Sequence, residues 1–413
     1  MNRFARRYFC YWLCLELILC LIAFSLPSHS VNYQKANHPT TTEIRGVWLT
    51  NVASGVLFVP WGINRAVNQL SALNFNTIYP VVWNRGHTFY NSAVAKKIIG
   101  SDTQTLLKIM HGGGDILAKL IKLAKPKGLS IVPWFEYGLM TPHNSELARR
   151  YSDWLTIGQE GIKSIKESPR EEIDSHISKQ AWLNPLHPQV QEFLQELIVE
   201  VVSNYDVDGI QLDDHFGMPV QFGYDAFTVE LYQQEHQGKS PPKNPFNPEW
   251  MRWRADKITD FMAAIYQAVK AIKPHAKISL SPNSQAFAYK YYLQNWEDWV
   301  KKGLVDELIL QVYRDNKSSF IAELEKPAVE FARSQIPVGI GITTGTLHDS
   351  VDTAQIKEQV KVVRDRKFPG ISFFYWESLW GYISPESPQQ RRRAFGEIFN
   401  TKAARPILLP KKI

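Results

Sequence analysis

The stretch YDVDGIQLDDHF (residues 205–216) ends an apolar run with two adjacent carboxylates and a histidine. Side chains alternate along a β-strand, so Gln211 and Asp213 share one face, while Asp214 shares the other with the apolar residues of the run. We expect the apolar face to meet covering helices, Gln211 and Asp213 to point into a barrel or cleft, and Asp214 to lie where the strand ends. Two consecutive aspartates at a strand end are also common in turns and helix N-caps. The rest of the sequence is therefore needed to distinguish a functional site from a turn.

Seven further runs of β-branched and aromatic residues flank this stretch and alternate with amphipathic segments. The runs cover residues 45–51, 75–83, 129–137, 276–283, 305–313, 336–344 and 369–376, and periodic segments typical of helices include 63–73, 114–128, 191–205 and 256–274. Eight strands that are each followed by a helix predict an α/β fold of the (β/α)8 TIM-barrel type. A doubly wound open sheet is the alternative.

The length and composition fit one such domain. The chain has 413 residues, of which 44% are hydrophobic and 21% charged, an ordinary globular composition. We assign residues 43–400 to the barrel, 31–42 to a leader and 401–413 to a short tail. Two connections, 138–184 after the third strand and 217–250 after the fourth, are longer than packing requires. Both leave from the C-terminal ends of strands, where barrel enzymes build their clefts, so we expect long insertions that form cleft walls.

Residues 1–30 have the organisation of a secretory signal peptide. Three arginines stand within the first seven residues, an apolar run extends from residue 8 to 26, and Pro27 and small residues follow. This order predicts cleavage near Ser30 and an exported protein of the periplasm or cell envelope. An uncleaved membrane anchor is the alternative. All three cysteines lie in this segment, so the mature chain offers no thiolate metal site and no cysteine nucleophile.

Charge and loop composition restrict the partners. The formal net charge is +7, of which the predicted signal peptide carries a net +2, and the remaining charge of about +5 suits an anionic envelope or polysaccharide surface. The basic residues are scattered apart from residues 391–393, so we expect no nucleic acid partner. Glycines 112–114 precede a helix that Asp115 would cap, but no Lys-Ser/Thr pair of a phosphate loop follows. We expect no cofactor.

Polar and aromatic side chains collect at the strand ends, on the face predicted to point inward. A sugar ring offers hydroxyl groups to amides and carboxylates and apolar C–H faces to aromatic rings, so this mixture favours a carbohydrate ligand. The residues that we expect to contact substrate are Trp48, Tyr79, Trp83, Arg85, Trp134, Gln211, His215, Asn283, Gln311, Tyr313, Trp376 and Glu377.

Glycoside hydrolysis needs one protonated carboxyl group and one ionised carboxylate. Asp213 is the first candidate because its side chain is predicted to point inward. Asp214 and Glu136 are the candidates for the second carboxyl group, and Asp315 and Glu377 are further alternatives. Two neighbouring carboxylates raise the pKa of one of the pair, so Asp213 together with Asp214 or Glu136 would supply the acid.

A metal site and a serine hydrolase are both disfavoured. Asp213, Asp214 and His215 alternate in direction along a strand, so we expect that they cannot all converge on an ion, and the other histidines of the barrel region lack metal-ligand spacing. We therefore predict no metal. A G-x-S-x-G nucleophile elbow is absent from the sequence.

Several blocks, in order along the chain, resemble one known family. They are RGVWLTN (45–51), YPVVWNRG (79–86), KGLSIVPWF (127–135), LNPLHPQVQ (183–191), YDVDGIQLDDHF (205–216), WMRWRADKIT (250–259), LSPN (280–283) and ELILQVYR (307–314). Together they resemble the glycosyl hydrolase-like 10 family over residues 43–382. The resemblance implies a (β/α)8 barrel, an exported or envelope location and a glycosidase that acts on polysaccharide, with peptidoglycan glycan strands favoured.

The motifs of that family fall on particular residues of this chain. The matching residues are Asp208, Gly209, Asp213 and Asp214 for its strand-four D-G-x-x-x-D-D block, Trp253 and Arg254 for its W-R-R-like block, and Gln311 and Tyr313 for its P-Q-x-Y block. The resemblance thereby adds Arg254 to the residues expected to contact substrate. His215 stands where the family often has an aromatic residue, a departure that affects substrate identity more than reaction type. A catalytically inactive carbohydrate-binding barrel is the alternative function.

Overall fold

Eight parallel strand positions form a closed barrel at the centre of the molecule. The structure is a computed structural model that describes residues 41–164, 180–346, 349–381 and 384–406. In chain order the strands are β2 (Ile44–Leu49), β3 (Thr77–Asn84), β5 (Ser130–Ile131) with β6 (Trp134–Phe135), β10 (Gly209–Asp213), β11 (Lys277–Ser281), β12 (Glu307–Gln311), β13 (Val338–Thr343) and β14 (Gly370–Phe374). The prediction of a (β/α)8 barrel is confirmed, and closure between β2 and β3 excludes the open sheet.

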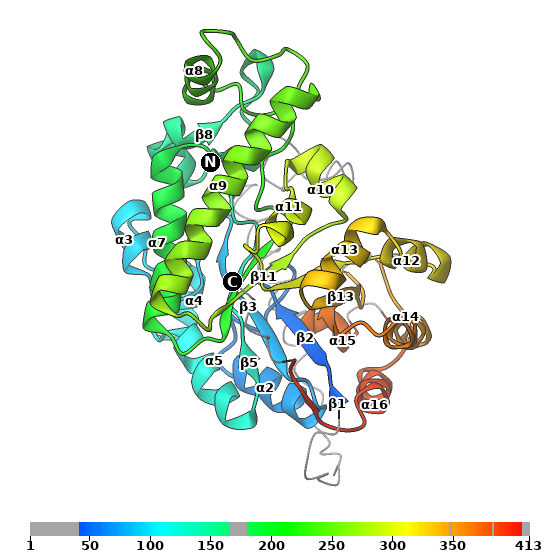
Figure 1. Cartoon of the computed structure of the whole chain (residues 1–413). Coiled ribbons are helices and arrows are strands. Elements are labelled where there is room, and N and C mark those ends of the chain that lie inside the picture. The colour runs from blue at the N-terminus through cyan, green and yellow to red at the C-terminus, as the bar shows by residue number, and fades with distance from the viewer. Residues whose placement is uncertain (1–40, 165–179, 347–348, 382–383, 407–413) are drawn as a thin grey trace, which may run out of the picture.

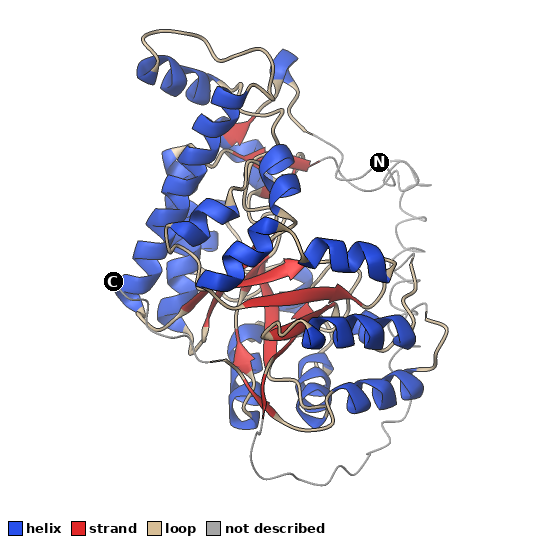
Figure 2. Cartoon of the chain, turned by 45° about the vertical axis from the view of Figure 1, so that its right-hand side comes forward, coloured by secondary structure: helices blue, strands red, loops and turns tan. Residues whose placement is uncertain are grey.

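Helices follow the strands and pack outside the barrel (Figures 1 and 2). The main ones are α2 (Gly62–Ala72), α5 (Ile116–Ala124), α7 (Pro188–Asn204), α9 (Pro248–Ile272), α11 (Trp296–Lys301), α13 (Pro327–Gln335), α14 (Thr353–Asp365) and α16 (Pro388–Ile398). In α5, Ile116, Leu117 and Leu120 are buried, which is the spacing of one helical face. Asp115 caps this helix as predicted, since its carboxylate accepts the N–H of Ala118 at 2.9 Å.

Two irregularities decide which side chains reach the barrel interior. Pro133 separates β5 from β6 because proline has no N–H for the strand ladder, although its carbonyl still accepts the N–H of Gln211 at 2.7 Å. In β3 the register against β6 shifts between Val81 and Trp83. Such a bulge changes the direction of the side chains that follow it. Trp83 consequently faces the helix α7, and Asn84 faces the interior.

Two longer connections extend beyond the C-terminal end of the barrel. Between β6 and α7 lies a three-stranded antiparallel sheet of β7 (Met140–Pro142), β9 (Gln180–Leu183) and β8 (Leu155–Thr156), and between β10 and α9 lies α8 (Ala226–Glu235). The two connections contact each other, because the N–H of Tyr224 donates to the carbonyl of Ile157 at 2.9 Å. Figure 1 shows α8 and β8 at the same end of the molecule.

The described chain ends lie together at the opposite end of the barrel. The strand β1 (Thr41–Thr42) pairs in parallel with β15 (Ala403–Ala404), and the following residue, Arg405, enters the barrel. Its guanidinium donates to the hydroxyl of Thr77 at 3.0 Å and to the carboxylate of Glu307 at 2.8 Å. Only 8% of the Arg405 side chain is exposed. The first residues of the predicted tail therefore form part of the barrel base.

The predicted signal peptide, residues 1–30, lies outside the described residues. Among the residues that the structure does describe, no helix combines the length and the apolar character needed to cross a bilayer. Export therefore stays a prediction from the sequence.

Candidate active site

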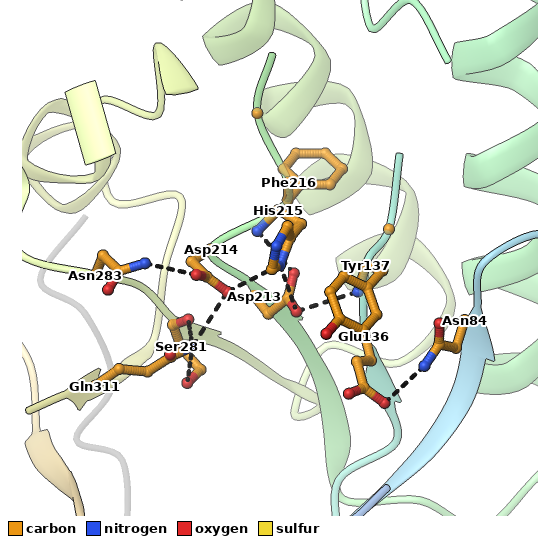
Figure 3. A network of polar contacts seen from close by, with 12 residues as sticks. Asn84, Glu136, Tyr137, Asp213, Asp214, His215, Phe216, Ser281, Asn283 and Gln311 are labelled. Atoms are coloured by element: carbon orange, nitrogen blue, oxygen red, sulfur yellow. Dashed lines mark hydrogen bonds and ion pairs between the residues drawn. The ribbon is translucent and has the colours of Figure 1, made fainter. Parts of the chain in front are cut away.

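Asp213 ends β10 at the mouth of the barrel, and main-chain groups hold its carboxylate in place (Figure 3). The N–H of Tyr137 donates to Oδ2 at 3.1 Å, and the N–H of His215 donates to Oδ1 at 2.9 Å. The side-chain amide of Gln294 donates to the carbonyls of Asp213 and Phe216 at 2.8 and 3.0 Å, which fixes the turn after the strand. Only 2% of the Asp213 side chain is exposed.

Asp214 also faces the mouth of the barrel. The expectation that it shares a face with the apolar residues of the strand is wrong, because β10 ends at Asp213 and strand alternation does not extend to the next residue. The Asp214 carboxylate accepts hydrogen bonds from Asn283 Nδ2 at 2.5 Å and from Gln311 Nε2 at 3.2 Å. With 16% of its side chain exposed, Asp214 is more accessible than Asp213.

The imidazole of His215 lies between the two aspartates. Its Nδ1 is 3.1 Å from Asp214 Oδ1 and 3.4 Å from Asp213 Oδ2. Burial lowers the pKa of this histidine, but the two carboxylates, that of Asp214 foremost, outweigh burial and hold the pKa well above its ordinary value. The ring is therefore cationic at neutral pH. It packs on the ring of Tyr137, with 4.5 Å between the ring centroids.

The side chains of Asp213, Asp214 and His215 converge, contrary to expectation. One possible ligand atom from each lies within 4.8 Å of the others, because the chain turns after β10 instead of continuing as a strand. The geometric argument against a metal ion is therefore wrong, since two carboxylates and an imidazole form a donor set that suits a divalent cation. In the geometry described here, the imidazolium supplies the positive charge beside the two carboxylates.

Glu136 extends the network on the other side of Asp213 (Figure 3). It is 3% exposed, and its carboxylate accepts hydrogen bonds from the hydroxyl of Thr50 at 2.8 Å and from Asn84 Nδ2 at 2.9 Å. Burial raises the pKa of Glu136 to about 8, with a further contribution from the charge of Asp213 and against the hydrogen bond from Thr50. Glu136 thus retains its proton at neutral pH.

The pKa values of the three carboxyl groups in this network are shifted in different directions. Burial raises the pKa of Asp213. Burial acts in the same direction on Asp214, but the cationic ring of His215 outweighs it and lowers the pKa of Asp214 below its ordinary value. The pKa of Asp214 is therefore lowered in the same network in which burial raises the pKa values of Asp213 and Glu136. Neighbouring carboxyl groups whose pKa values are separated by their surroundings are typical of acid–base sites.

Aromatic rings line the same mouth. Tyr313, which follows β12, stacks on Phe374 with 5.5 Å between the ring centroids. The guanidinium of Arg85 lies 4.6 Å from the centroid of the Tyr137 ring, and that ring in turn contacts His215. The structure thus brings Arg85 and Tyr313 to the mouth, together with the predicted residues Asn283 and Gln311.

Trp48, Trp134 and Gln211 lie deeper, below the carboxyl groups. Trp48 Nε1 donates to Gln211 Oε1 at 2.7 Å, and Gln211 Nε2 donates to the hydroxyl of Ser279 at 3.0 Å. The rings of Trp48 and Trp134 are 6.2 Å apart. These three side chains and that of Ser279 are buried. The predicted contact residues Trp48, Trp134 and Gln211 therefore form the floor under the site.

Two of the predicted substrate contacts, Tyr79 and Trp83, lie elsewhere. Tyr79 is fully buried towards the barrel base, where its hydroxyl is 3.5 Å from a guanidinium nitrogen of Arg405. Tyr79 lies near the start of β3, whereas the mouth is formed by the C-terminal ends of the strands. Trp83 packs against Phe193 of α7 with 5.5 Å between the ring centroids, because the bulge in β3 turns it outward. Both residues stabilise the barrel.

Arg254 also lies outside the mouth, and Trp376 is buried against a neighbouring ring. Arg254, on α9, is fully buried and donates to the carbonyl of Val220 at 2.6 Å and to that of Phe222. It therefore fastens the connection after β10 to α9. Trp376 begins the short helix α15 (Trp376–Leu379) and packs on Trp380 with 5.3 Å between the ring centroids.

The two alternative carboxyl groups are not part of the network. Glu377 accepts hydrogen bonds from the N–H of Val56 at 3.0 Å and from the hydroxyl of Ser54, so it holds the loop after β2. Burial raises the pKa of Glu377 to about 7. Asp315 is exposed in the loop after β12.

The network also contains residues that were absent from the predicted contacts, among them Thr50, Asn84 and Gln294. Thr50 lies two positions after Trp48, so strand alternation extended by one step would have indicated it. Asn84 faces inward only because of the bulge in β3. Gln294 comes from the connection between α10 (Gln285–Tyr292) and α11, and its sequence context carries no signal of a contact with β10.

A family model described as Glycosyl hydrolase-like 10 matches residues 43–363. Among curated relatives, Glycosyl hydrolase YngK of Bacillus subtilis (strain 168) is 23% identical over 315 residues, which cover 67% of this chain and 55% of YngK, so the chain spans about half of that relative. Glycosyl hydrolase DigH of Escherichia coli (strain K12) is 24% identical over 351 residues, which cover 72% of this chain and 73% of DigH.

Solved structures share the fold. The glycoside hydrolase domain of PgaB (BpsB) from Bordetella bronchiseptica superposes with a TM-score of 0.61 at 13% identity, and the alignment covers 86% of this chain and 99% of that domain. The catalytic domain of β-amylase from Paenibacillus polymyxa superposes with a TM-score of 0.56 at 11% identity, covering 86% of this chain and 98% of that domain. The family match and the barrel fold together support a glycosidase.

Proposed function

The chain belongs to the glycosyl hydrolase-like 10 family, and from this premise we propose that it is an exported enzyme that hydrolyses O-glycosidic bonds in a cell-wall or envelope polysaccharide. The observation that carries the proposal is a network of three carboxyl groups at the barrel mouth whose surroundings shift their pKa values in opposite directions. The pKa of Asp214 is lowered, whereas burial raises the pKa values of Asp213 and Glu136.

Each of the three carboxyl groups has a role in this reaction. Asp214 is the ionised carboxylate that attacks the anomeric carbon or activates a water molecule, and its partial exposure leaves it open to substrate. Asp213 and Glu136 form the buried side of the network that retains a proton, which assists departure of the leaving oxygen. His215 stays cationic and orients both aspartates through its Nδ1.

The surrounding side chains suit a sugar. Asn283 and Gln311 each donate an amide N–H to Asp214, and Gln311 Nε2 also donates to the carbonyl of Ser281 at 2.9 Å. Their amide oxygens can accept hydrogen bonds from sugar hydroxyls. The ring of Tyr313 stacks on Phe374 with one face and offers the other to the C–H side of a sugar ring. The signal-peptide pattern of residues 1–30 and the net positive charge support an envelope polymer as the substrate. Among such polymers we favour peptidoglycan glycan strands.

The test is product analysis with the mature chain, from residue 31 onward. The protein is incubated with peptidoglycan glycan strands freed of peptides and with a panel of other polysaccharides, and the products are identified by mass. We expect shortened strands with new reducing ends. Polymers that are bound but remain intact would instead establish the inactive carbohydrate-binding barrel, and an absence of both binding and cleavage would reject a carbohydrate role altogether.

A further inference from the structure

Three large aromatic side chains are exposed next to the candidate active site. Phe246, Phe287 and Tyr291 have exposed fractions of 42%, 43% and 40%. Phe287 and Tyr291 stand four residues apart on α10, so they share one face of that helix, and their ring centroids are 5.0 Å apart. Phe246 approaches from the connection before α9, with its centroid 6.4 Å from that of Tyr291. Buried packing does not account for rings that remain this exposed.

The exposed rings are continuous with the carboxyl network. The ring of Tyr292 is 6.0 Å from Phe287 on one side and 6.2 Å from His215 on the other. Tyr292 also lies 6.1 Å from Trp182, whose indole is 6.1 Å from His215. A series of rings therefore runs outward from the histidine between the two aspartates. We call Tyr292, Phe287, Tyr291 and Phe246 the aromatic track.

The aromatic track is fixed relative to the carboxyl groups. The N–H groups of Met218 and Val220, which follow the Asp213–His215 turn, donate to the carbonyls of Tyr292 and Tyr291, each at 2.8 Å. Gln294, two residues after Tyr292, donates its amide to the carbonyls of Asp213 and Phe216. One set of hydrogen bonds thus holds both the end of α10 and the catalytic turn. A surface that is ordered before binding loses little entropy when ligand arrives.

We propose that the aromatic track is an extended binding surface for a polysaccharide chain, on which successive sugar rings stack as the polymer leaves the cleavage site. This inference rests on the proposed function and deepens it, because it makes a long glycan the substrate in preference to a short oligosaccharide. Sugar rings present apolar C–H faces to aromatic rings. Lys290, whose ammonium lies 5.1 Å from the centroid of the Tyr291 ring, adds a cation beside the track and suits a glycan that carries carboxylates.

Chain-length dependence tests the aromatic track. The double variant Phe287→Ala/Tyr291→Ala is compared with the wild type on peptide-free glycan strands and on a disaccharide or tetrasaccharide fragment of the same strands. We expect the kcat/KM for the strands to fall by about threefold to tenfold per ring, mainly through KM, while the value for the short fragment stays the same. Ile272→Ala, an exposed apolar residue at the far end of α9, is the matched control and should change neither value.

A binding arm separates failure of the aromatic track from failure of the proposed hydrolysis. Retention of the glycan strands is measured for Asp214→Asn with and without the double substitution, so that no turnover is needed. Loss of retention with the double substitution supports the track even if the wild type hydrolyses nothing. Equal retention, or equal losses on strands and fragments, would overturn it.

A further pair of variants distinguishes ring stacking from general apolar contact. Tyr291→Phe keeps an aromatic face and should retain the strands as the wild type does, whereas Tyr291→Leu keeps apolar surface without a ring and should lose retention. Full retention by Tyr291→Leu would show that the patch docks an apolar partner and not a sugar, and would refute the proposal. The melting temperatures should stay unchanged, because both changes are at an exposed position.

Discussion

Replacing Glu136 with glutamine tests whether this buried carboxyl group retains its proton at neutral pH. Glu136 is 3% exposed, and burial raises its pKa from 4.5 to about 8. In the unfolded chain the group ionises near its ordinary pKa, but in the folded protein it stays protonated to about pH 8. The wild type therefore loses free energy of unfolding as the pH rises between those two values. A glutamine side chain carries no titratable proton, so Glu136→Gln lacks this loss.

The size of the effect follows from the pKa values. At about 1.4 kcal/mol per pH unit, a rise from 4.5 to about 8 corresponds to an upper value on the order of 5 kcal/mol. Water entry and relaxation around a buried charge reduce this value, so we expect a change on the order of 3 kcal/mol in the difference between the variant and the wild type. The variant gains in relative stability from pH 5 to pH 9.

Chemical denaturation at a series of pH values measures this difference. Titration of all other groups cancels between the two proteins, and any pH-independent cost of the amide shifts the whole curve without changing its slope. Glu43→Gln is the control. Burial disfavours the charge of Glu43, but Arg364 and Arg45 outweigh burial and hold its pKa below 4.5, so Glu43 is ionised in the folded and the unfolded chain above that pH and the difference curve of this variant should be flat from pH 5 to pH 9. A flat difference curve for Glu136→Gln would refute the buried proton.

Three further predictions address the barrel and the metal question. Arg405→Met leaves the carboxylate of Glu307 buried without its cation and should lower the free energy of unfolding by about 3–5 kcal/mol; an unchanged melting temperature would contradict the role of Arg405 in the base. Trp83→Ala should lower the free energy of unfolding by about 3–5 kcal/mol, because packing on α7 is lost, and should leave the KM for glycan unchanged. A raised KM with normal stability would instead show that Trp83 contacts the substrate. Treatment with a chelator should leave hydrolysis intact because the proposed acid–base reaction uses carboxyl groups alone, and a loss that divalent ions restore would show a metal enzyme.

The barrel was predictable because its signal is repeated along the chain. Each strand position combines an apolar run with a following amphipathic helix, so an error in one segment does not change the fold. The inward direction of Gln211 and Asp213 also follows from strand alternation, which requires only that β10 stays regular up to Asp213. Local periodicity was sufficient for both results.

The residues that were misplaced depend on departures from that periodicity. The bulge in β3 exchanges the directions of Trp83 and Asn84, and the end of β10 frees Asp214 and His215 to turn back towards each other. A pattern that assumes regular strands cannot indicate either event. A resemblance between motifs also does not separate packing from binding, since Arg254 holds the connection after β10 and has no place at the mouth.

Long-range contacts were beyond reach for a different reason. Arg405 meets Glu307 across 98 residues of sequence, and Gln294 meets Asp213 across 81. Neither arginine nor glutamine in a polar segment differs in sequence from a solvent-exposed residue. The closed barrel places the Arg405 guanidinium beside a buried carboxylate and the Gln294 amide beside a main-chain carbonyl. These contacts can be identified only from the three-dimensional structure.

The initial rate at which reducing ends are released from peptide-free glycan strands tests the central claim most directly. Asp214→Asn removes the ionised carboxylate and should lower this rate by at least about a hundredfold, with the fold retained. Asp315→Asn, an exposed aspartate outside the network, should keep the rate of the wild type. A rate for Asp214→Asn within about threefold of the wild type, well short of the contribution expected of a catalytic carboxylate, would contradict the account.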